Sequence, residues 1–425
     1  MRRALVLALT FVLFSSFLAG CWNRREINEL AIVSAVGIDR ENGLWRLTAE
    51  IFRPLTVGGE GGGGGGGAGG GPVRQAWVVR GEGYTVFQAV RDMALKVPRR
   101  VYWAHCTAAI VGEEAARAGI NEMLDFWDRD AELRRSTNIL VCRGKAEDLI
   151  VANQGSLEKT VGLEVVGLKK TARADAHSRI TSIHEFLVAL AASGADPVAS
   201  GLELKVMPEP PGLTPGGGGE GGGSQGGRGA GGGGEVKKQP MHVLRLKGLA
   251  LFRNDKLVGF FEPKEARGLN WVQGDITSTV INVKCPLHPV KRDNNVALEL
   301  FRLRTKLEVK EKEGRPEVMV KVKAELGLAD QGCPGDLTKP GPTRSLERQA
   351  ATVIRNEIEA AVAKAKNLGV DPFAFGEAIH RGQPKLWKNI EKDWPQGLKG
   401  LTVKIDSRAK IRRSALSNTA PQESP

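Results

Sequence analysis

Two serines in this chain occupy spacings that enzymes use for nucleophilic catalysis. Ser156 and Lys159 form an S-x-x-K pair, but the Ser-Asp-Asn and Lys-Thr-Gly segments that accompany this pair in penicillin-recognising enzymes are missing from the sequence. Ser224 lies in a Gly-x-Ser-x-Gly pattern inside a glycine tract, where no strand–turn–helix can hold its hydroxyl in place. We therefore predict that the protein is not an enzyme.

The six histidines form no recognisable metal-binding motif. The sequence contains no His-Glu-x-x-His, and Cys285 and His288 stand alone beside prolines, whereas a metal site needs three or four converging ligands. The segment Arg99–Trp103 combines arginines with aromatic residues and could stack on bases, but it falls on a predicted core strand. We predict no metal, no cofactor and no nucleic-acid partner.

A cysteine near the N-terminus has a clearer chemical role. Arg2 and Arg3 precede an apolar run, Ala4–Leu18, which is shorter than the roughly 18 residues that a membrane-spanning helix needs. Leu18-Ala19-Gly20-Cys21 follows the bacterial lipobox pattern, in which the cysteine thiol receives a diacylglyceryl group and becomes the first residue of the mature chain. The alternative is an ordinary secretory cleavage beside a chance cysteine.

We predict that residues 1–20 are a signal peptide and that Cys21 carries the lipid. Two acyl chains anchor a protein stably, because each buried CH₂ contributes ~0.8 kcal/mol and a single chain holds only marginally. The mature protein would then work on the outer face of the cytoplasmic membrane.

Length and charge constrain the rest of the chain. A chain of 425 residues is long enough for two or three domains with separate cores. Its formal charge is +13, and loss of Arg2 and Arg3 with the signal peptide leaves +11, which favours anionic lipid headgroups or wall polymers. The other cysteines show no C-x-x-C pair, so we expect buried or free thiols, although spacing leaves any pairing open. They are Cys106, Cys142, Cys285 and Cys333.

Hydrophobic periodicity predicts an α+β fold. Leu44–Ile51 alternates as a strand, and Tyr84–Val97 reads as a helix with Phe87 and Ala94 on its apolar stripe. Residues 99–112 read as a strand, residues 113–119 and 120–128 as helices, and residues 137–142 as a further strand. Helices that alternate with strands in this way pack on a mixed sheet.

Two glycine tracts interrupt this pattern. Gly58–Gly71 and Gly216–Gly234 cannot bury enough apolar area to offset their chain entropy. Strand-like segments flank both tracts, so we interpret each as an overgrown hairpin loop.

The second half of the chain contains a hairpin and a long helix. Two apolar strands between Lys247 and Phe261 are joined at Arg253-Asn254-Asp255-Lys256, where asparagine and aspartate favour a turn. Two long alternating segments, residues 297–309 and 317–328, precede an amphipathic helix at Arg344–Leu368, which Gly369 ends. A final basic strand is predicted at residues 401–411.

Several of these segments resemble the Ger(x)C spore-germination lipoproteins. The resemblance is carried by the lipobox followed at once by tryptophan, by a strand that ends Gly37-Ile38-Asp39, by the hairpin Lys247–Phe261, and by Asp371-Pro372-Phe373-Ala374-Phe375-Gly376. It implies a lipid-anchored, non-catalytic C subunit of a nutrient germinant receptor in the spore inner membrane. The partners it implies are integral-membrane A-type and B-type subunits, together with membrane lipid. The alternative is an extracytoplasmic solute-binding lipoprotein of a transporter.

We expect three mixed α/β domains, each a sheet with packed helices. The ranges are 1–20 (signal peptide), 21–199 (N-terminal α+β domain with the loop 58–71), 200–292 (middle β-rich domain with the loop 216–234), 293–413 (C-terminal α+β domain) and 414–425 (disordered tail). Charged and turn residues outside the expected cores are the candidate partner-binding residues. They are Arg24, Arg25, Glu26, Asn254, Asp255 and Lys256.

Overall fold

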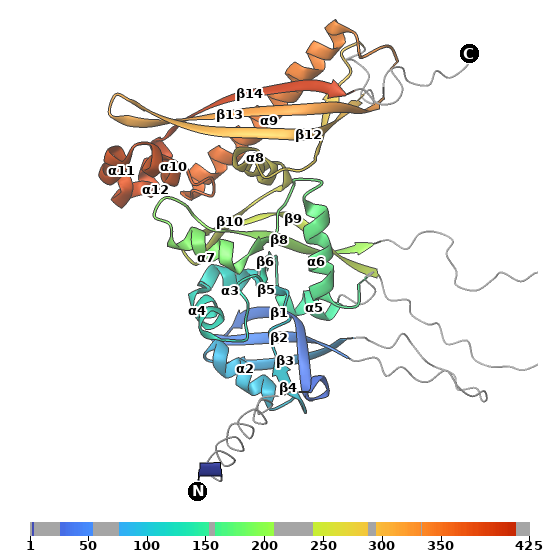
Figure 1. Cartoon of the computed structure of the whole chain (residues 1–425), viewed down its shortest axis with the longest axis vertical. Helices are drawn as coiled ribbons and strands as arrows, with labels where there is room; N and C mark the ends of the chain where they lie inside the picture. Colours follow the sequence, from blue (N-terminus) through green and yellow to red (C-terminus); the bar gives the residue numbers. More distant parts are fainter. Residues whose placement is uncertain are drawn as a thin grey trace, which may run out of the picture.

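The computed structural model describes residues 2–3, 26–53, 76–152, 158–207, 241–287, 295–332 and 334–413. These residues form an elongated molecule in which two β-sheets follow one another along the long axis (Figure 1). The larger sheet has ten strands and the smaller has four. Mixed sheets with packed helices confirm the predicted α+β class.

The larger sheet combines parallel central strands with antiparallel flanks. Its strands are β1 (Leu30–Glu41), β2 (Leu44–Phe52), β3 (Ala76–Gly83), β4 (Arg100–Tyr102), β5 (Ala108–Gly112), β6 (Asn138–Cys142), β7 (Thr181–Ser182), β8 (Val198–Met207), β9 (Met241–Arg253) and β10 (Lys256–Phe261). The order is β10-β9-β8-β6-β5-β1-β2-β3, with β4 beside β1 and β7 beside β6. The four central strands β8, β6, β5 and β1 run parallel to one another, so each is joined to the next by a crossover connection.

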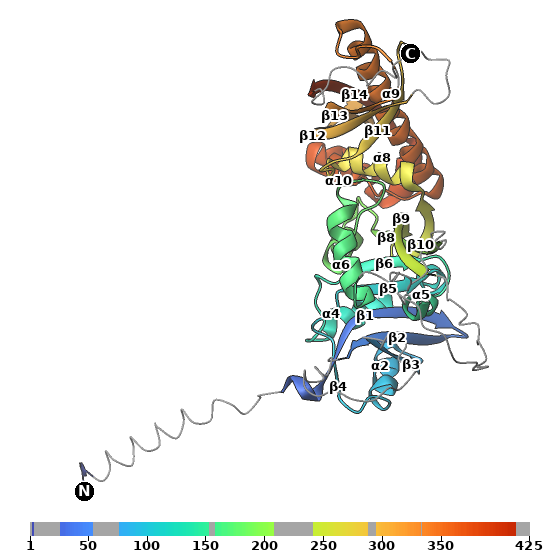
Figure 2. The same ribbon diagram turned by 90° about the vertical axis from the view of Figure 1, so that its right-hand side faces the viewer.

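Helices cover both faces of the larger sheet. They are η1 (Ile27–Glu29), α2 (Val86–Ala94), α3 (Glu113–Ala118), α4 (Asn121–Arg129), α5 (Ala146–Ala152), α6 (Val161–Ala172) and α7 (Ile183–Ala191). In Figure 1, α3, α4 and α7 lie on one side and α5 and α6 on the other, the side that Figure 2 faces. Along β5, Ala108 and Ile110 enter the core under α5 and α6, and Ala109 and Val111 enter the opposite core. Burial on both faces explains why this strand is apolar throughout.

The smaller sheet is covered on one face by a long helix. Its strands are β11 (Val280–Lys284), β12 (Asn295–Lys312), β13 (Arg315–Gln331) and β14 (Thr402–Arg413), in this order. Its helices are α8 (Pro263–Gln273), α9 (Pro340–Leu368), α10 (Phe375–Gly382), α11 (Pro384–Ile390), η2 (Glu391–Asp393) and α12 (Trp394–Gly400). On β13, alternate residues from Val318 to Leu326 are buried, which fits a sheet with one covered face.

α8 and α9 cross closely because a glycine lies between them. A Cβ on Gly268 would be only 2.2 Å from the carbonyl oxygen of Glu357. The Glu357 carboxylate binds the guanidinium of Arg267, and both side chains are 7% exposed. Trp271 Nε1 also donates to this carboxylate, at 2.9 Å. This buried ion pair therefore holds α8 against α9.

Most predicted elements are present, and two predictions are wrong in detail. Phe87 and Ala94 are exposed on α2, whose buried residues are Val86, Ala89 and Met93. The strand predicted over residues 99–112 is divided into β4 and β5. Sequence patterns also gave no prediction of α5, α6 or α8.

The larger sheet continues through one of the predicted domain boundaries. The limit between residues 199 and 200 falls within β8, and β9 and β10 extend the same sheet. The division into three domains stays a prediction. Both glycine tracts lie outside the described residues, but their flanking strands pair as predicted: Phe52 lies opposite Ala76, and Met207 opposite Met241.

The cysteines divide into two groups. Cys106 and Cys142 are buried and free, as expected. Cys285 is disulfide-bonded, so the expectation of a free thiol was wrong there. Its neighbour Lys284 ends β11, and spacing along the chain carried no signal of this bond. Cys333 lies outside the described residues.

Candidate functional site: the junction at the β9–β10 turn

The turn between β9 and β10 contains three of the predicted partner-binding residues. Asn254 adopts a left-handed backbone conformation, with φ +54°, and is exposed, as is Lys256. Asp255 is half-buried instead, and it binds within the protein: its carbonyl oxygen accepts a hydrogen bond from the Ile120 backbone N–H at 3.1 Å, and its Oδ2 accepts one from the Asn121 N–H at 3.2 Å. The turn therefore holds the start of α4.

The same turn contacts the end of α9. Arg253 Nη2 donates to the carbonyl oxygen of Gly369 at 2.9 Å and to that of Leu368. Carbonyl groups at a helix C-terminus lack helical partners, and a guanidinium satisfies them and complements the helix dipole. Consequently one turn links the larger sheet to the helix that covers the smaller one.

A second connection lies beside it and joins two short segments. The Asp196 N–H donates to the Asp371 carbonyl at 2.9 Å, and the Asp371 N–H donates to Asp196 Oδ2 at 2.7 Å. Beside this pair, the Glu377 N–H donates to the Gly194 carbonyl at 3.1 Å, and Glu377 Oε1 accepts from the Gly194 N–H at 3.2 Å. These reciprocal bonds fasten the loop before β8 to the start of α10.

The side chain of Asp371 caps α10 from inside the protein. Its oxygens accept hydrogen bonds from the N–H groups of Phe375 and Gly376, at 3.1 and 2.9 Å, and from Trp394 Nε1 at 3.2 Å. Burial raises the pKa of Asp371 to about 7, against the opposing effect of these hydrogen bonds, and the carboxylate of Asp196 adds to the rise. Burial also raises the pKa of Asp196. We name Asp196, Asp371 and their bonded segments, with residues 253–256, the junction.

Two further buried carboxylates cap helices that pack on the larger sheet. Asp39, which ends the Gly-Ile-Asp segment, accepts hydrogen bonds from the N–H groups of Ala146 and Glu147 at 2.8 and 2.9 Å. A Cβ on Gly112 would lie 2.0 Å from Asp39 Oδ1, so this position favours glycine. Burial raises the pKa of Asp39. The carboxylate thus fixes the first turn of α5.

Glu50 does the same for α6. It accepts hydrogen bonds from Ser34 Oγ at 2.5 Å and from the Val161 N–H at 3.1 Å. Burial raises the pKa of Glu50 as well. Sequence reasoning missed these capping roles, although a carboxylate within an apolar strand is the signal that could have indicated them.

Several residues considered for catalysis or ligand binding cannot be placed, and the described ones have structural roles or are exposed. Ser156, His288 and the glycine tract around Ser224 lie outside the described residues, and Lys159 is exposed. Arg100 pairs with Glu132, and Trp103 is buried. Among the described residues, no three or more histidine, cysteine, aspartate or glutamate side chains are grouped so that they could hold a metal ion.

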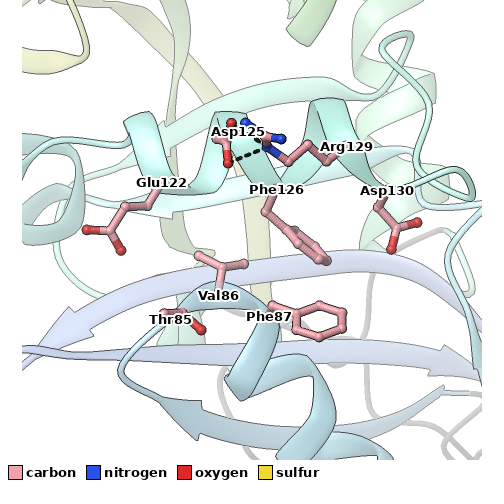
Figure 3. Close-up of a pocket in the computed structure, with 8 residues that line it drawn as sticks. All are labelled: Thr85, Val86, Phe87, Glu122, Asp125, Phe126, Arg129 and Asp130. Atoms are coloured by element: carbon pink, nitrogen blue, oxygen red, sulfur yellow. Dashed lines mark hydrogen bonds and ion pairs between the residues drawn. The ribbon is translucent and has the colours of Figure 1, made fainter.

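A groove of about 420 Å³ lies between α2 and α4 (Figure 3). Its lining residues are Thr85, Val86, Phe87, Glu122, Asp125, Phe126, Arg129 and Asp130. The rings of Phe87 and Phe126 face each other, 6.1 Å apart. Arg129 Nε binds Asp125 at 2.8 Å, and Glu122 accepts from Trp45 Nε1 at 2.7 Å. Because these charges are already paired, the groove mainly offers aromatic surface.

The other predicted site residues lie at or before the start of the described chain. Cys21, Arg24 and Arg25 lie outside the described residues, and Glu26 is exposed just before η1. No helix within the described part of the chain is both long and apolar enough to cross a membrane.

Comparison with known protein families shows to which family the chain belongs. Residues 23–204 match the family described as "Spore germination protein N-terminal domain", and residues 247–415 match "Spore germination B3/ GerAC like, C-terminal". The chain belongs to the Ger(x)C family of spore germination proteins. The two matched regions meet at the β8–β9 hairpin, within one sheet.

Two relatives from Bacillus subtilis agree with this family membership. Spore germination protein KC of Bacillus subtilis (strain 168) is 30% identical over 425 residues, with 98% of each chain covered. Spore germination protein B3 of the same organism is 22% identical, covering 93% of this chain and 94% of its own length. A crystal structure of the GerBC protein aligns at 18% identity with a TM-score of 0.49, over 89% of this chain and 96% of that one.

Proposed function

We propose that this protein is the lipid-anchored, non-catalytic C-type subunit of a nutrient germinant receptor in the spore inner membrane. In this role it sits on the outer face of that membrane and assembles with integral-membrane A-type and B-type subunits. The observation that carries the proposal is the order of features along the chain. A lipobox that ends at Cys21 is followed at residue 23 by the first of the two family regions.

The junction supports a binding role rather than a catalytic one. Its carboxylates accept hydrogen bonds from backbone N–H groups and are used in holding helices. Asn254 and Lys256 remain exposed on the turn, and with Arg24, Arg25 and Glu26 they stay our candidate partner-binding residues. Asp255 is better explained by its bond to α4.

A solute-binding lipoprotein is the competing proposal. That class has two similar lobes around a cleft, whereas the described residues of this chain form one ten-stranded and one four-stranded sheet of different topology. Finding an amino acid or sugar bound to the purified protein would favour it.

The anchor is tested by the Cys21→Ala variant, expressed in spores in place of the natural protein. We expect uncleaved or soluble protein and weaker germination, because the local concentration at the complex falls when the two acyl chains are lost. Ser16→Ala, which leaves the lipobox intact, is the matched control. Membrane fractionation and nutrient-triggered germination are the readouts. Full membrane retention of Cys21→Ala with normal germination would show that the anchor is not needed.

The position of the partner surface is tested by charge reversal. Reversing Arg24 and Arg25 should reduce co-purification of the membrane subunits more than reversing Lys410 and Arg412, because residues beside the anchor are held at the bilayer surface. Lys410 and Arg412 are exposed ion-paired residues of β14 at the far sheet, and so serve as the comparison. Equal recovery from both variants, or greater loss from the β14 pair, would place the contact elsewhere.

A further inference from the structure

Large apolar side chains on α2 and at its two ends are left largely exposed by the described structure. The Phe87 ring also lies beside Phe126 of α4, with 6.1 Å between the ring centres. Leu95 is 88% exposed, Tyr84 is 75% exposed and Phe87 is 50% exposed. Phe87, Arg91 and the C-cap residue Leu95 follow the spacing of one helical face, opposite the buried face of α2, and Tyr84 lies just before the N-cap residue of the helix. Their exposure therefore belongs to one continuous stripe rather than to scattered single residues.

This stripe lies at the end of the molecule where the anchored segment enters. β1 and β4 are parallel, with Leu30 opposite Arg100, so the residues before each strand leave the sheet at the same end. Before Leu30 comes Ile27, which is 74% exposed, and before Arg100 comes Leu95. Figure 1 places α2, β3 and β4 together at this end, far from the smaller sheet. Leu30 comes nine positions after Cys21 in the chain, which allows a reach of at most ~30 Å.

The charges along this segment suit an anionic surface. Between Tyr84 and Arg100 there are four cationic side chains and a single carboxylate, Asp92. Asp92 is paired with Lys96 at 2.6 Å, and the Arg91 guanidinium lies 4.9 Å from the Phe87 ring centre. Carboxylates nearby include Glu26 and Glu29 beside Ile27, and Glu132, which pairs with Arg100. Glu122, Asp125 and Asp130 of the α4 region line the groove beside Phe87. Of these, Asp125 is paired with Arg129, and Glu122 accepts a hydrogen bond from Trp45 and lies 3.9 Å from Arg40.

We propose that Ile27, Tyr84, Phe87, Arg91 and Leu95, which we name the α2 face, lie in the headgroup region of the bilayer that holds the anchor. Apolar side chains flanked by cations bind at this depth, ~5–10 Å into the boundary between headgroups and acyl chains. A lipid surface fits better than a protein partner, because the short tether brings the bilayer within reach of the stripe. This inference rests on the lipid anchor of the proposed function. It adds an orientation, with the larger sheet at the membrane and the smaller sheet away from it.

The test places a fluorescent label at single positions of the full lipidated protein. Leu95→Cys and Tyr84→Cys probe the α2 face, and Val188→Cys on α7, where Val188 is 57% exposed, is the matched control. Each cysteine is labelled with an environment-sensitive dye. The native Cys106 and Cys142 are buried, and burial raises the pKa of the Cys106 thiol to about 12, so they react poorly. The protein is reconstituted into vesicles of phosphatidylethanolamine and phosphatidylglycerol that contain spin-labelled lipid.

We expect blue-shifted emission and strong quenching at positions 84 and 95, more from a shallow spin label than from a deep one, and neither effect at position 188. If the protein floats with the vesicles but positions 84 and 95 behave like position 188, the inference is overturned while the anchor stands. If the protein does not float with vesicles at all, the anchor itself fails. A shift that appears only when the integral-membrane subunits are added would show that the α2 face contacts protein, which also overturns the inference.

Discussion

The buried carboxyl of Asp371 should make the stability of this protein fall as the pH rises. Its pKa is about 7 in the folded protein and 3.8 without the fold, because burial disfavours the ionised form. The folded protein therefore binds more protons than the unfolded chain between these two values. The stabilising contribution is fully present below pH 3.8 and is lost as the pH rises through about 7.

The Asp371→Asn variant removes this titration and keeps an oxygen that can accept hydrogen bonds. From the two pKa values, Asp371 alone should lower the free energy of unfolding of the natural protein by ~2–3 kcal/mol between about pH 5 and pH 8. The Asp371→Asn variant has no carboxyl to ionise, so its free energy of unfolding should fall by ~2–3 kcal/mol less than that of the natural protein over this pH range. A change in stability that the amide causes equally at both pH values does not affect this comparison. Urea unfolding followed by tryptophan fluorescence at the two pH values measures it, since Trp394 contacts the carboxyl.

Asp336→Asn is the matched control. Hydrogen bonds from Thr338 hold the pKa of Asp336 below its usual range, so this carboxylate is ionised in both states from about pH 5 to pH 8. Its replacement should leave the pH dependence of the natural protein intact. If Asp371→Asn and the natural protein lose stability in parallel with rising pH, the pKa of Asp371 is not raised and the reasoning is refuted.

Two other changes test the packing. Glu357→Ala leaves the buried guanidinium of Arg267 unpaired and should lower the free energy of unfolding in urea by ~3–5 kcal/mol. The control Glu359→Ala, on the exposed side of α9, should lower it little. A loss of ~1 kcal/mol or less for Glu357→Ala would mean that the pair behaves like a surface ion pair. Replacing Gly58–Gly71 with a short turn should change the melting temperature only slightly. The flanking strands already pair, and the entropy of closing the loop changes by ~1 kcal/mol or less over this length. A large drop in melting temperature would show that the tract contributes to the fold.

Sequence periodicity was sufficient for the elements that have one buried face. β13 alternates because one side of its sheet is covered, and the long apolar stripe of α9 follows the same logic. It failed on α2, where apolar residues occupy two faces. Val86 and Met93 are buried and Phe87 is exposed, and a list of residues cannot tell which face meets the sheet.

Long-range pairing and buried polar contacts were also beyond the sequence. Nothing in the pattern of β8, β9 and β10 shows that they extend the sheet begun by β1, because strand pairing depends on residues far apart in the chain. The carboxylates gave a partial signal. Asp39 and Asp371 were noticed as parts of family-like segments, but their bonds to distant backbone N–H groups could be found only from the folded chain.

Segments that carry the family resemblance hold the two sheets together, and this constrains how the sheets can move relative to each other. The hairpin turn binds α4 through Asp255 and α9 through Arg253, and Asp371 joins α10 to the loop that contains Asp196. Because these bonds connect both sheets at one place, a partner that pushes on the smaller sheet moves the larger sheet with it. Domain motions of this kind require a hinge, and closely bonded segments do not provide one. Under the proposed function, the protein would therefore act on its membrane partners by changing orientation as one body.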